Sequence, residues 1–217
     1  MPEQATPLKI DFVSDVSCPW CAVGLGALQE ALARLGPQVR ATLHFQPFEL
    51  NPQMGPQGQD IGEHLAQKYG SSPEQAAQAR LAIRERGAAV GFDFRMDKRN
   101  RIYNTFDAHR LLHWAGEQGE AEQLALKRAL FTAYFTDGLN PGDRNVLLDA
   151  ARHVGLDTTQ AADVLDTGRY ADEVRQRERF YLDSGIHSVP SVIINDRHLI
   201  QGGQPVEAFE QALRQVA

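Results

Sequence analysis

The stretch SDVSCPWCAVG, Ser14 to Gly24, contains both cysteines of the 217-residue chain. Cys18 and Cys21 are separated by a proline and a tryptophan, so they lie one turn apart on the same face if the stretch is helical. A pair with this spacing can cross-link the fold, bind a metal ion or exchange disulfides. The residues on either side of the pair help to decide between these three roles.

The flanking sequence predicts a strand, a helix and a second strand. LKIDFVSD, residues 8–15, alternates apolar residues and then ends in serine and aspartate, as a strand that enters a loop does. After the cysteines, apolar residues recur at three- and four-residue spacing until Gly36 and Pro37, which stop a helix. Residues 39–50 then supply a second strand. The two cysteines therefore lie at a strand-to-helix junction.

The remainder of the chain predicts a helical insertion in an α/β domain. Glutamate, glutamine, alanine and arginine dominate residues 59–183, with apolar residues at helical spacing. Residues 189–195 and 198–201 predict a hairpin, and residues 202–217 predict a closing helix. We therefore expect one domain from residues 1–58 and 184–217, and an inserted helical domain over residues 59–183. Its expected helices lie near 60–69, 73–90, 104–116, 120–136, 143–153 and 158–183, the last broken near Gly168.

Composition narrows the partners and the compartment. The net charge of −6 gives no electrostatic reason to expect nucleic acid or an anionic membrane as a partner. The first residues do not form a secretory signal, and no apolar run is long enough to span a membrane. We expect a cytoplasmic protein, in which the thiol pool reduces structural disulfides. A permanent cross-link is therefore the weakest of the three roles.

A metal site is the next weakest. Structural zinc takes four ligands, and one pair of cysteines supplies two, so His109 and His113 would have to complete the site. Histidines at this spacing more often pack or form hydrogen bonds, and HRLLH lacks the glutamate of a zinc-peptidase helix. We expect no metal ion.

Disulfide exchange fits the position of the pair best. The reactive form of cysteine is the thiolate, and a free thiol with a pKa of about 8.5 is mostly protonated at neutral pH. The first amides and the dipole of a helix favour an anion, and Cys18 lies where the predicted helix begins. Pro19 suits the first helical position, and we expect Trp20 to be partly exposed as an apolar contact for a substrate. Cys21 is then placed to attack a mixed disulfide formed at Cys18.

With CPWC at this junction, SVPSV before the hairpin and helices between them, the chain resembles the DsbA-like thioredoxin-fold family. More narrowly it resembles the FrnE-like branch, grouped with 2-hydroxychromene-2-carboxylate isomerases and kappa-class glutathione transferases. The resemblance covers nearly the whole chain and implies a thioredoxin fold with a large all-helical insertion. The motifs that carry it are SDVSCPWCAVG at Ser14, PFELNP at Pro47, YNTFDAHRLLHWA at Tyr103, LFTAYFTDGLN at Leu130 and GIHSVPSVIINDRHLIQGGQP at Gly185.

The resemblance also implies roles for individual residues. It places a cis Val189–Pro190 bond beside Cys18, with Cys18 as the exposed nucleophile and Cys21 as the buried resolving cysteine. Pro19, Trp20, Val189 and Pro190 are the implied substrate contacts. Asn104 and His109 belong to the helical motif and are candidates to face the cleft, although a helix cap and a packed histidine explain them equally well.

Three functions follow from these observations. The isomerases and kappa transferases have a serine at the position of Cys18, so the dithiol favours a thiol–disulfide oxidoreductase acting on a protein or small-molecule thiol or disulfide. It needs no cofactor, although glutathione stays open as a co-substrate and a homodimer as the assembly. One alternative is a glutathione-dependent isomerase or transferase for an aromatic or polyketide-like substrate. Another is a redox-independent, chaperone-like binding module.

Overall fold

A mixed four-stranded sheet brings the two ends of the chain together. In the computed structural model, which describes residues 6–216, the strand order is β2-β1-β5-β6. β1 (Thr6–Ser14) runs parallel to β2 (Val39–Pro47) and antiparallel to β5 (Ser191–Ile194). β5 pairs in antiparallel fashion with β6 (His198–Gln201), which completes the predicted hairpin. The long segment between β2 and β5 leaves the sheet and returns to it.

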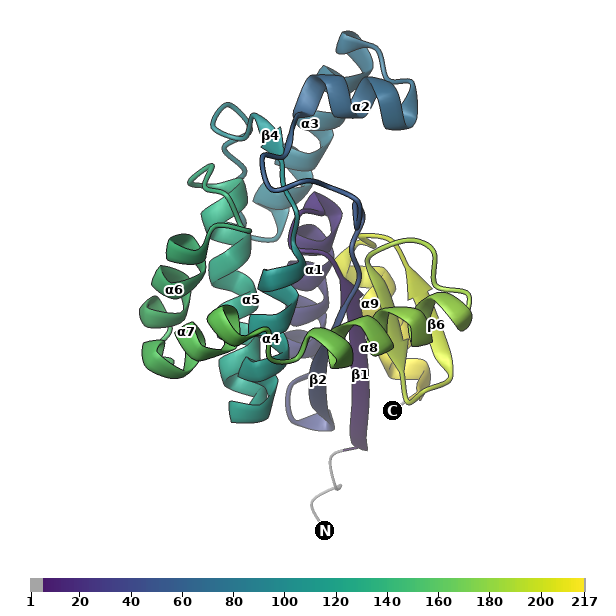
Figure 1. The fold of residues 1–217 in the computed structure, drawn as a ribbon. Helices are drawn as coiled ribbons and strands as arrows, with labels where there is room; N and C mark the ends of the chain where they lie inside the picture. Colours follow the sequence, from purple (N-terminus) through teal and green to yellow (C-terminus); the bar gives the residue numbers. More distant parts are fainter. Residues whose placement is uncertain (1–5, 217) are drawn as a thin grey trace.

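Helices cover both faces of this sheet (Figure 1). α1 (Pro19–Leu35) and α9 (Val206–Val216) pack on one face, where Phe12 and Phe209 belong to the same core. α8 (Ala171–Asp183) packs on the other face, where Val13 and Tyr181 cluster. Because β1 is central and covered on both sides, residues of both alternation sets are buried along its second half.

The expected helices between β2 and β5 are confirmed to within a few residues. The observed elements are α2 (Ile61–Tyr69), α3 (Pro73–Ala89), α4 (Phe106–Gln118), α5 (Glu120–Phe135), α6 (Arg144–His153), α7 (Thr158–Thr167) and α8. The predicted break at Gly168 is present, and this residue ends α7 with a φ of 78°. A two-stranded ladder of β3 (Gln59–Asp60) and β4 (Arg101–Ile102) was not predicted, because two-residue strands have no readable alternation.

Local signals explain several of the helix starts. Ser72 and Gln75 form a capping box at the start of α3, each side chain accepting a hydrogen bond from the backbone of the other residue. Asp143 and Asp157 accept hydrogen bonds from the first amides of α6 and α7. These caps satisfy amides that have no partner within their own helix.

The helices between β2 and β5 share part of their core with the sheet. Phe131, Tyr134 and Phe135 of α5 belong to the same buried cluster as Phe12 of β1. α4, α6 and α7 surround a second cluster that contains Trp114. α2 and α3 instead project beyond the end of the sheet at which α1 begins (Figure 1).

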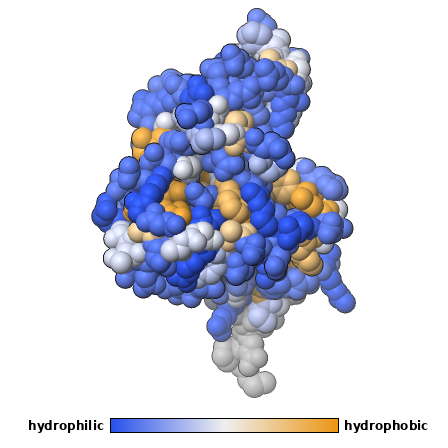
Figure 2. Space-filling view, in the orientation of Figure 1, coloured by the Kyte–Doolittle hydropathy of each residue, from blue (hydrophilic) through white to orange (hydrophobic). Residues whose placement is uncertain are grey.

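The surface is mostly hydrophilic in the view of Figure 2, with separate hydrophobic patches. Within residues 6–216, no helix combines the length and the apolar character that a membrane crossing requires.

Candidate active site

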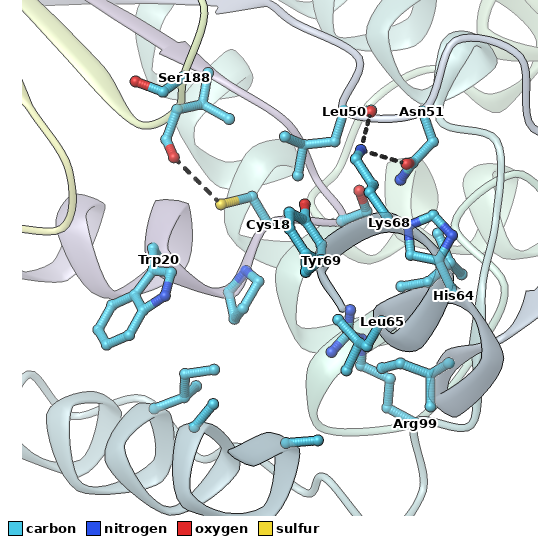
Figure 3. Close-up of a pocket in the computed structure, with 18 of the residues that line it drawn as sticks. Cys18, Trp20, Leu50, Asn51, His64, Leu65, Lys68, Tyr69, Arg99 and Ser188 are labelled. Carbon is cyan, nitrogen blue, oxygen red and sulfur yellow. Dashed lines mark hydrogen bonds between the residues drawn. The ribbon is translucent and has the colours of Figure 1, made fainter. Parts of the chain in front are cut away.

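Cys18 occupies the N-cap position of α1, as the sequence predicts, and Pro19 is the first helical residue. The Cys18 amide donates a hydrogen bond to the Asp15 carbonyl (3.2 Å), and the Cys21 amide donates one to the Cys18 carbonyl (3.1 Å). The Cys18 side chain makes no capping hydrogen bond to the helix. Its Sγ instead lies 3.6 Å from the Val189 carbonyl oxygen, across the site (Figure 3). The sulfur is thus held at the positive end of a helix.

The loop before β5 forms the opposite wall of the site. The Val189–Pro190 peptide bond is cis, and Pro190 is buried against α1. A methyl group placed on Gly24 would come within 3.1 Å of Pro190 Cγ, so the helix and the proline pack closely. Because Pro190 lacks an N–H, β5 begins one residue later at Ser191.

Both cysteines are buried, but only Cys18 borders a cavity. Cys18 is only 4% exposed, so the expectation of an exposed nucleophile is wrong for the side chain as a whole, because the surrounding loops cover it. It borders a cavity of about 630 Å³, together with Pro19, Trp20 and Val189. Trp20 is half-buried, as expected. Cys21 is 0% exposed and is not part of the cavity wall.

The thiols of this pair are not equivalent. Both cysteines are free thiols. Burial raises the pKa of Cys21 well above its ordinary value, and the neighbouring Cys18 raises it further. Cys21 is therefore protonated at neutral pH and shielded from solvent, while Cys18 faces the space that a substrate would enter.

Asn104 and His109 do not line the cavity. The Asn104 side chain accepts a hydrogen bond from the Phe106 amide (2.9 Å) at the start of α4. It also donates one to the Met54 carbonyl. His109 is buried, with its Nε2 3.6 Å from the Asp15 carboxylate. Asn104 therefore binds the first amide of α4 from the position before the N-cap residue Thr105, and His109 is a packed histidine. Neither side chain borders the cavity.

Asp15 is a buried charged group that the sequence reasoning did not single out. Its carboxylate accepts hydrogen bonds from the amides of Ser17 (3.0 Å) and Leu50 (2.7 Å). Burial by itself would raise the pKa of Asp15, but His109 and these two amides outweigh it and lower the pKa to about 2. The sequence signal for this group is an aspartate three residues before the first cysteine, at a position that also suits the end of the predicted strand.

Lys127 is a second buried charge that was missed. Its side chain on α5 is 1% exposed, and its Nζ lies 5.0 Å from the centre of the Phe131 ring. Burial lowers the pKa of Lys127 to about 8, although the charges of Cys21, Asp15 and Cys18 act to raise it. In turn, the lysine charge acts to lower the pKa of Cys21. Lys127, Phe131 and Tyr134 share one helical face, so the sequence did hold a signal for its burial.

Within residues 6–216, no group of three or more His, Cys, Asp or Glu side chains is arranged to hold a metal ion. His109 faces Asp15, whereas the His113 ring packs 5.0 Å from the ring of Tyr170. The two histidines considered as zinc ligands therefore have different partners.

Comparison with known proteins gives the family. The model of the DSBA-like thioredoxin domain matches residues 9–214, which is nearly the whole chain. The chain belongs to this family. Its sheet and its helices between β2 and β5 are therefore those of a DsbA-like thioredoxin fold with a helical insertion.

Individual relatives agree with this assignment. A probable DsbA oxidoreductase from Streptomyces coelicolor is 34% identical, with a TM-score of 0.86 over 96% of this chain and 89% of its own. The uncharacterized protein YwbO of Bacillus subtilis is 28% identical over 95% of this chain and 96% of its own. The cytosolic disulfide reductase DsbM of Pseudomonas aeruginosa, in a structure with GSH, shares the fold at 17% identity and a TM-score of 0.65, covering 96% of this chain and 98% of its own.

Proposed function

We propose that the protein is a thiol–disulfide oxidoreductase in which Cys18 is the nucleophile and Cys21 the resolving cysteine. The observation that carries this proposal is the asymmetry of the pair. Cys18 lies at the N-terminus of α1 and borders the cavity, while Cys21 lies one turn behind it and is fully buried. Membership of the DsbA-like family, which includes oxidoreductases, supports the same chemistry.

The reaction has two exchange steps. The Cys18 thiolate attacks one sulfur of a substrate disulfide, so that a mixed disulfide forms and the other substrate sulfur leaves as a thiolate that takes a proton. Cys21 then loses its proton and attacks Cys18 Sγ, which releases the second substrate thiol. The substrate gains two electrons, and the protein dithiol becomes a disulfide. The reverse sequence oxidises a substrate dithiol.

The residues around Cys18 have separate roles in this scheme. Cys18 lies at the N-terminus of α1 and borders the cavity, so it is the sulfur that a substrate disulfide meets first. The Val189 carbonyl, 3.6 Å from Cys18 Sγ, marks the wall against which a bound substrate would lie. The positive charge of Lys127 helps Cys21 to ionise for the second step, because it lowers the pKa of that thiol.

A variant that stops the reaction between the two steps tests this proposal. We expect Cys21→Ser to form a stable mixed disulfide at Cys18 with a small disulfide reagent, since a serine hydroxyl does not displace the bound thiol. The wild-type protein should release both thiols under the same conditions. Intact-mass spectrometry before and after the reaction gives the readout. An adduct that disappears from Cys21→Ser as fast as from the wild type would show that Cys21 does not resolve it.

A further inference from the structure

The cavity beside Cys18 is built from six parts of the chain. Its wall includes the start of α1, the loop after β2, the helices α2 and α3, the segment around β4, and the loop before β5. A volume of about 630 Å³ lies within the range that small-molecule sites occupy. Figure 3 shows Cys18 on one side of this space and Leu65, His64 and Arg99 on another.

Much of this wall is apolar. Trp20 borders the space next to Cys18, and Leu65 and Ile61 of α2 face it with Ile83 of α3. An aromatic or aliphatic body can replace water against these side chains, which favours its binding.

The charged groups in the wall are mostly cationic, although the chain as a whole carries a net charge of −6. They are Lys68, Arg80 and Arg99, against a single carboxylate, Glu49, among the described residues. That carboxylate already pairs with Arg175. The Lys68 ammonium donates to the Leu50 carbonyl (2.6 Å) and to the Asn51 side-chain oxygen (2.7 Å), neither of which carries a charge. The wall therefore has an excess of positive charge.

Within the described part of the chain, Arg99 is a cation of the wall with an unpaired donor. Its Nε is buried and has no hydrogen-bond partner within residues 6–216. Its guanidinium carbon lies 4.8 Å and 5.2 Å from the ring centres of Tyr134 and Phe135, which fix its position. A buried donor without an acceptor costs free energy, and a carboxylate is the acceptor that a guanidinium binds best.

We propose that this cavity binds a low-molecular-weight disulfide with an apolar body and an anionic group, and that Arg99 binds the anionic group. The proposal rests on the function proposed above and names its substrate class. Cys18 attacks the disulfide of the bound molecule, one half leaves as a thiol after taking a proton, and Cys21 releases the other half. The two electrons that reduce the molecule come from the Cys18–Cys21 dithiol.

The test compares aromatic disulfides that differ in charge. The reduced protein is mixed with dithiobis(nitrobenzoate), which is anionic, or with dithiodipyridine, which is neutral, and the second-order rates are measured by stopped flow. Each rate is divided by that of an unstructured cysteine peptide, which removes the intrinsic reactivity of the reagent. We expect the normalised rate of the anionic reagent to exceed that of the neutral one by about tenfold, as a charged hydrogen bond would provide. A ratio of one or less would overturn the proposal.

Two variants test whether Arg99 causes the preference for the anionic reagent. We expect Arg99→Gln to lower the rate with the anionic reagent about tenfold and to leave the rate with the neutral reagent within about twofold. Arg84→Gln is the matched control, since Arg84 lies exposed on α3 outside this cavity and its loss changes the net charge equally. Equal effects of the two variants, or an equal loss with both reagents in Arg99→Gln, would overturn the assignment of Arg99.

A third reagent tests the apolar part. Oxidised glutathione carries carboxylates on a polar body, so its normalised rate should lie below that of dithiobis(nitrobenzoate). Equal normalised rates would overturn the requirement for an apolar body. If none of the reagents modified Cys18, the proposed function itself would be wrong, whereas reaction without a charge preference would contradict only the substrate class.

Discussion

Replacing Cys18 by serine should slow the reaction with disulfide reagents by at least about a thousandfold, which is the scale seen when an enzyme loses its nucleophile. A serine hydroxyl is not ionised at neutral pH, and Cys21 is 0% exposed and cannot meet the reagent in its place. Release of the chromophoric thiol from dithiodipyridine, followed by stopped flow, measures the effect.

Two controls make this result specific to Cys18. Cys21→Ser should keep the first exchange step within about tenfold of the wild-type rate, because it leaves the nucleophile in place. Circular dichroism of both variants checks that the fold is intact. Retention of most of the wild-type rate in Cys18→Ser would assign the chemistry to another group.

Replacing Lys127 by methionine should make the protein more stable and its second step slower. The ordinary lysine pKa is 10.5 and burial lowers that of Lys127 to about 8. This difference corresponds to about 3 kcal/mol of free energy of unfolding that the buried charge costs at neutral pH. Methionine fills a similar volume without a charge. We therefore expect the free energy of unfolding at pH 7 to rise by about 3 kcal/mol in chemical denaturation.

The stability difference between Lys127→Met and the wild type should depend on pH in a definite direction. Below pH 8 both the folded and the unfolded wild type carry the lysine proton, so the full cost of the buried charge is present. Between pH 8 and the ordinary lysine pKa the folded state loses the proton first, so the wild type becomes more stable as the pH rises. The advantage of Lys127→Met should therefore be greatest below pH 8 and should nearly vanish by about pH 10.5. Lys98→Met, at an exposed lysine, is the control and should show no such profile.

The kinetic effect of Lys127→Met should have the opposite direction. The lysine charge lowers the pKa of Cys21, so its removal leaves less Cys21 thiolate to resolve the mixed disulfide. We expect the release of the second thiol to slow by about tenfold while the first step stays nearly unchanged. A variant that is less stable and resolves the mixed disulfide at the wild-type rate would contradict both roles.

The sequence predicted the order of strands and helices and the position of Cys18 at a helix start, because these depend on local patterns. The alternation of apolar residues in 8–15 and the glycine and proline after α1 are local signals, because each depends only on residues that are adjacent in the sequence. The burial of both faces of β1 was not predictable from that alternation, since it depends on α8, which is more than 150 residues away.

The charged groups around the site show the same limit. Charged residues lie on the surface by default, and the burial of Asp15 depends on its contact with the loop after β2. The apolar face of α5 was a local signal for Lys127, but its contact with Phe45 of β2 exists only in the folded chain. Arg99 lies between elements and carries no motif. Its place in the cavity follows only from the packing of α2, α3 and α5 around it. Conversely, Asn104 and His109 belong to a recognisable motif, but neither borders the cavity. Asn104 accepts a hydrogen bond from the first amide of α4, and His109 lies against Asp15.

Alkylation of the reduced protein tests the central claim most directly, namely that Cys18 is the thiol that a reagent in the cavity reaches and Cys21 is not. We expect iodoacetamide to modify Cys18 and to leave Cys21 unmodified in the peptide map, because only Cys18 borders the cavity and Cys21 is fully buried. A Cys18 that stays unmodified, or modification of Cys21 first, would contradict the account.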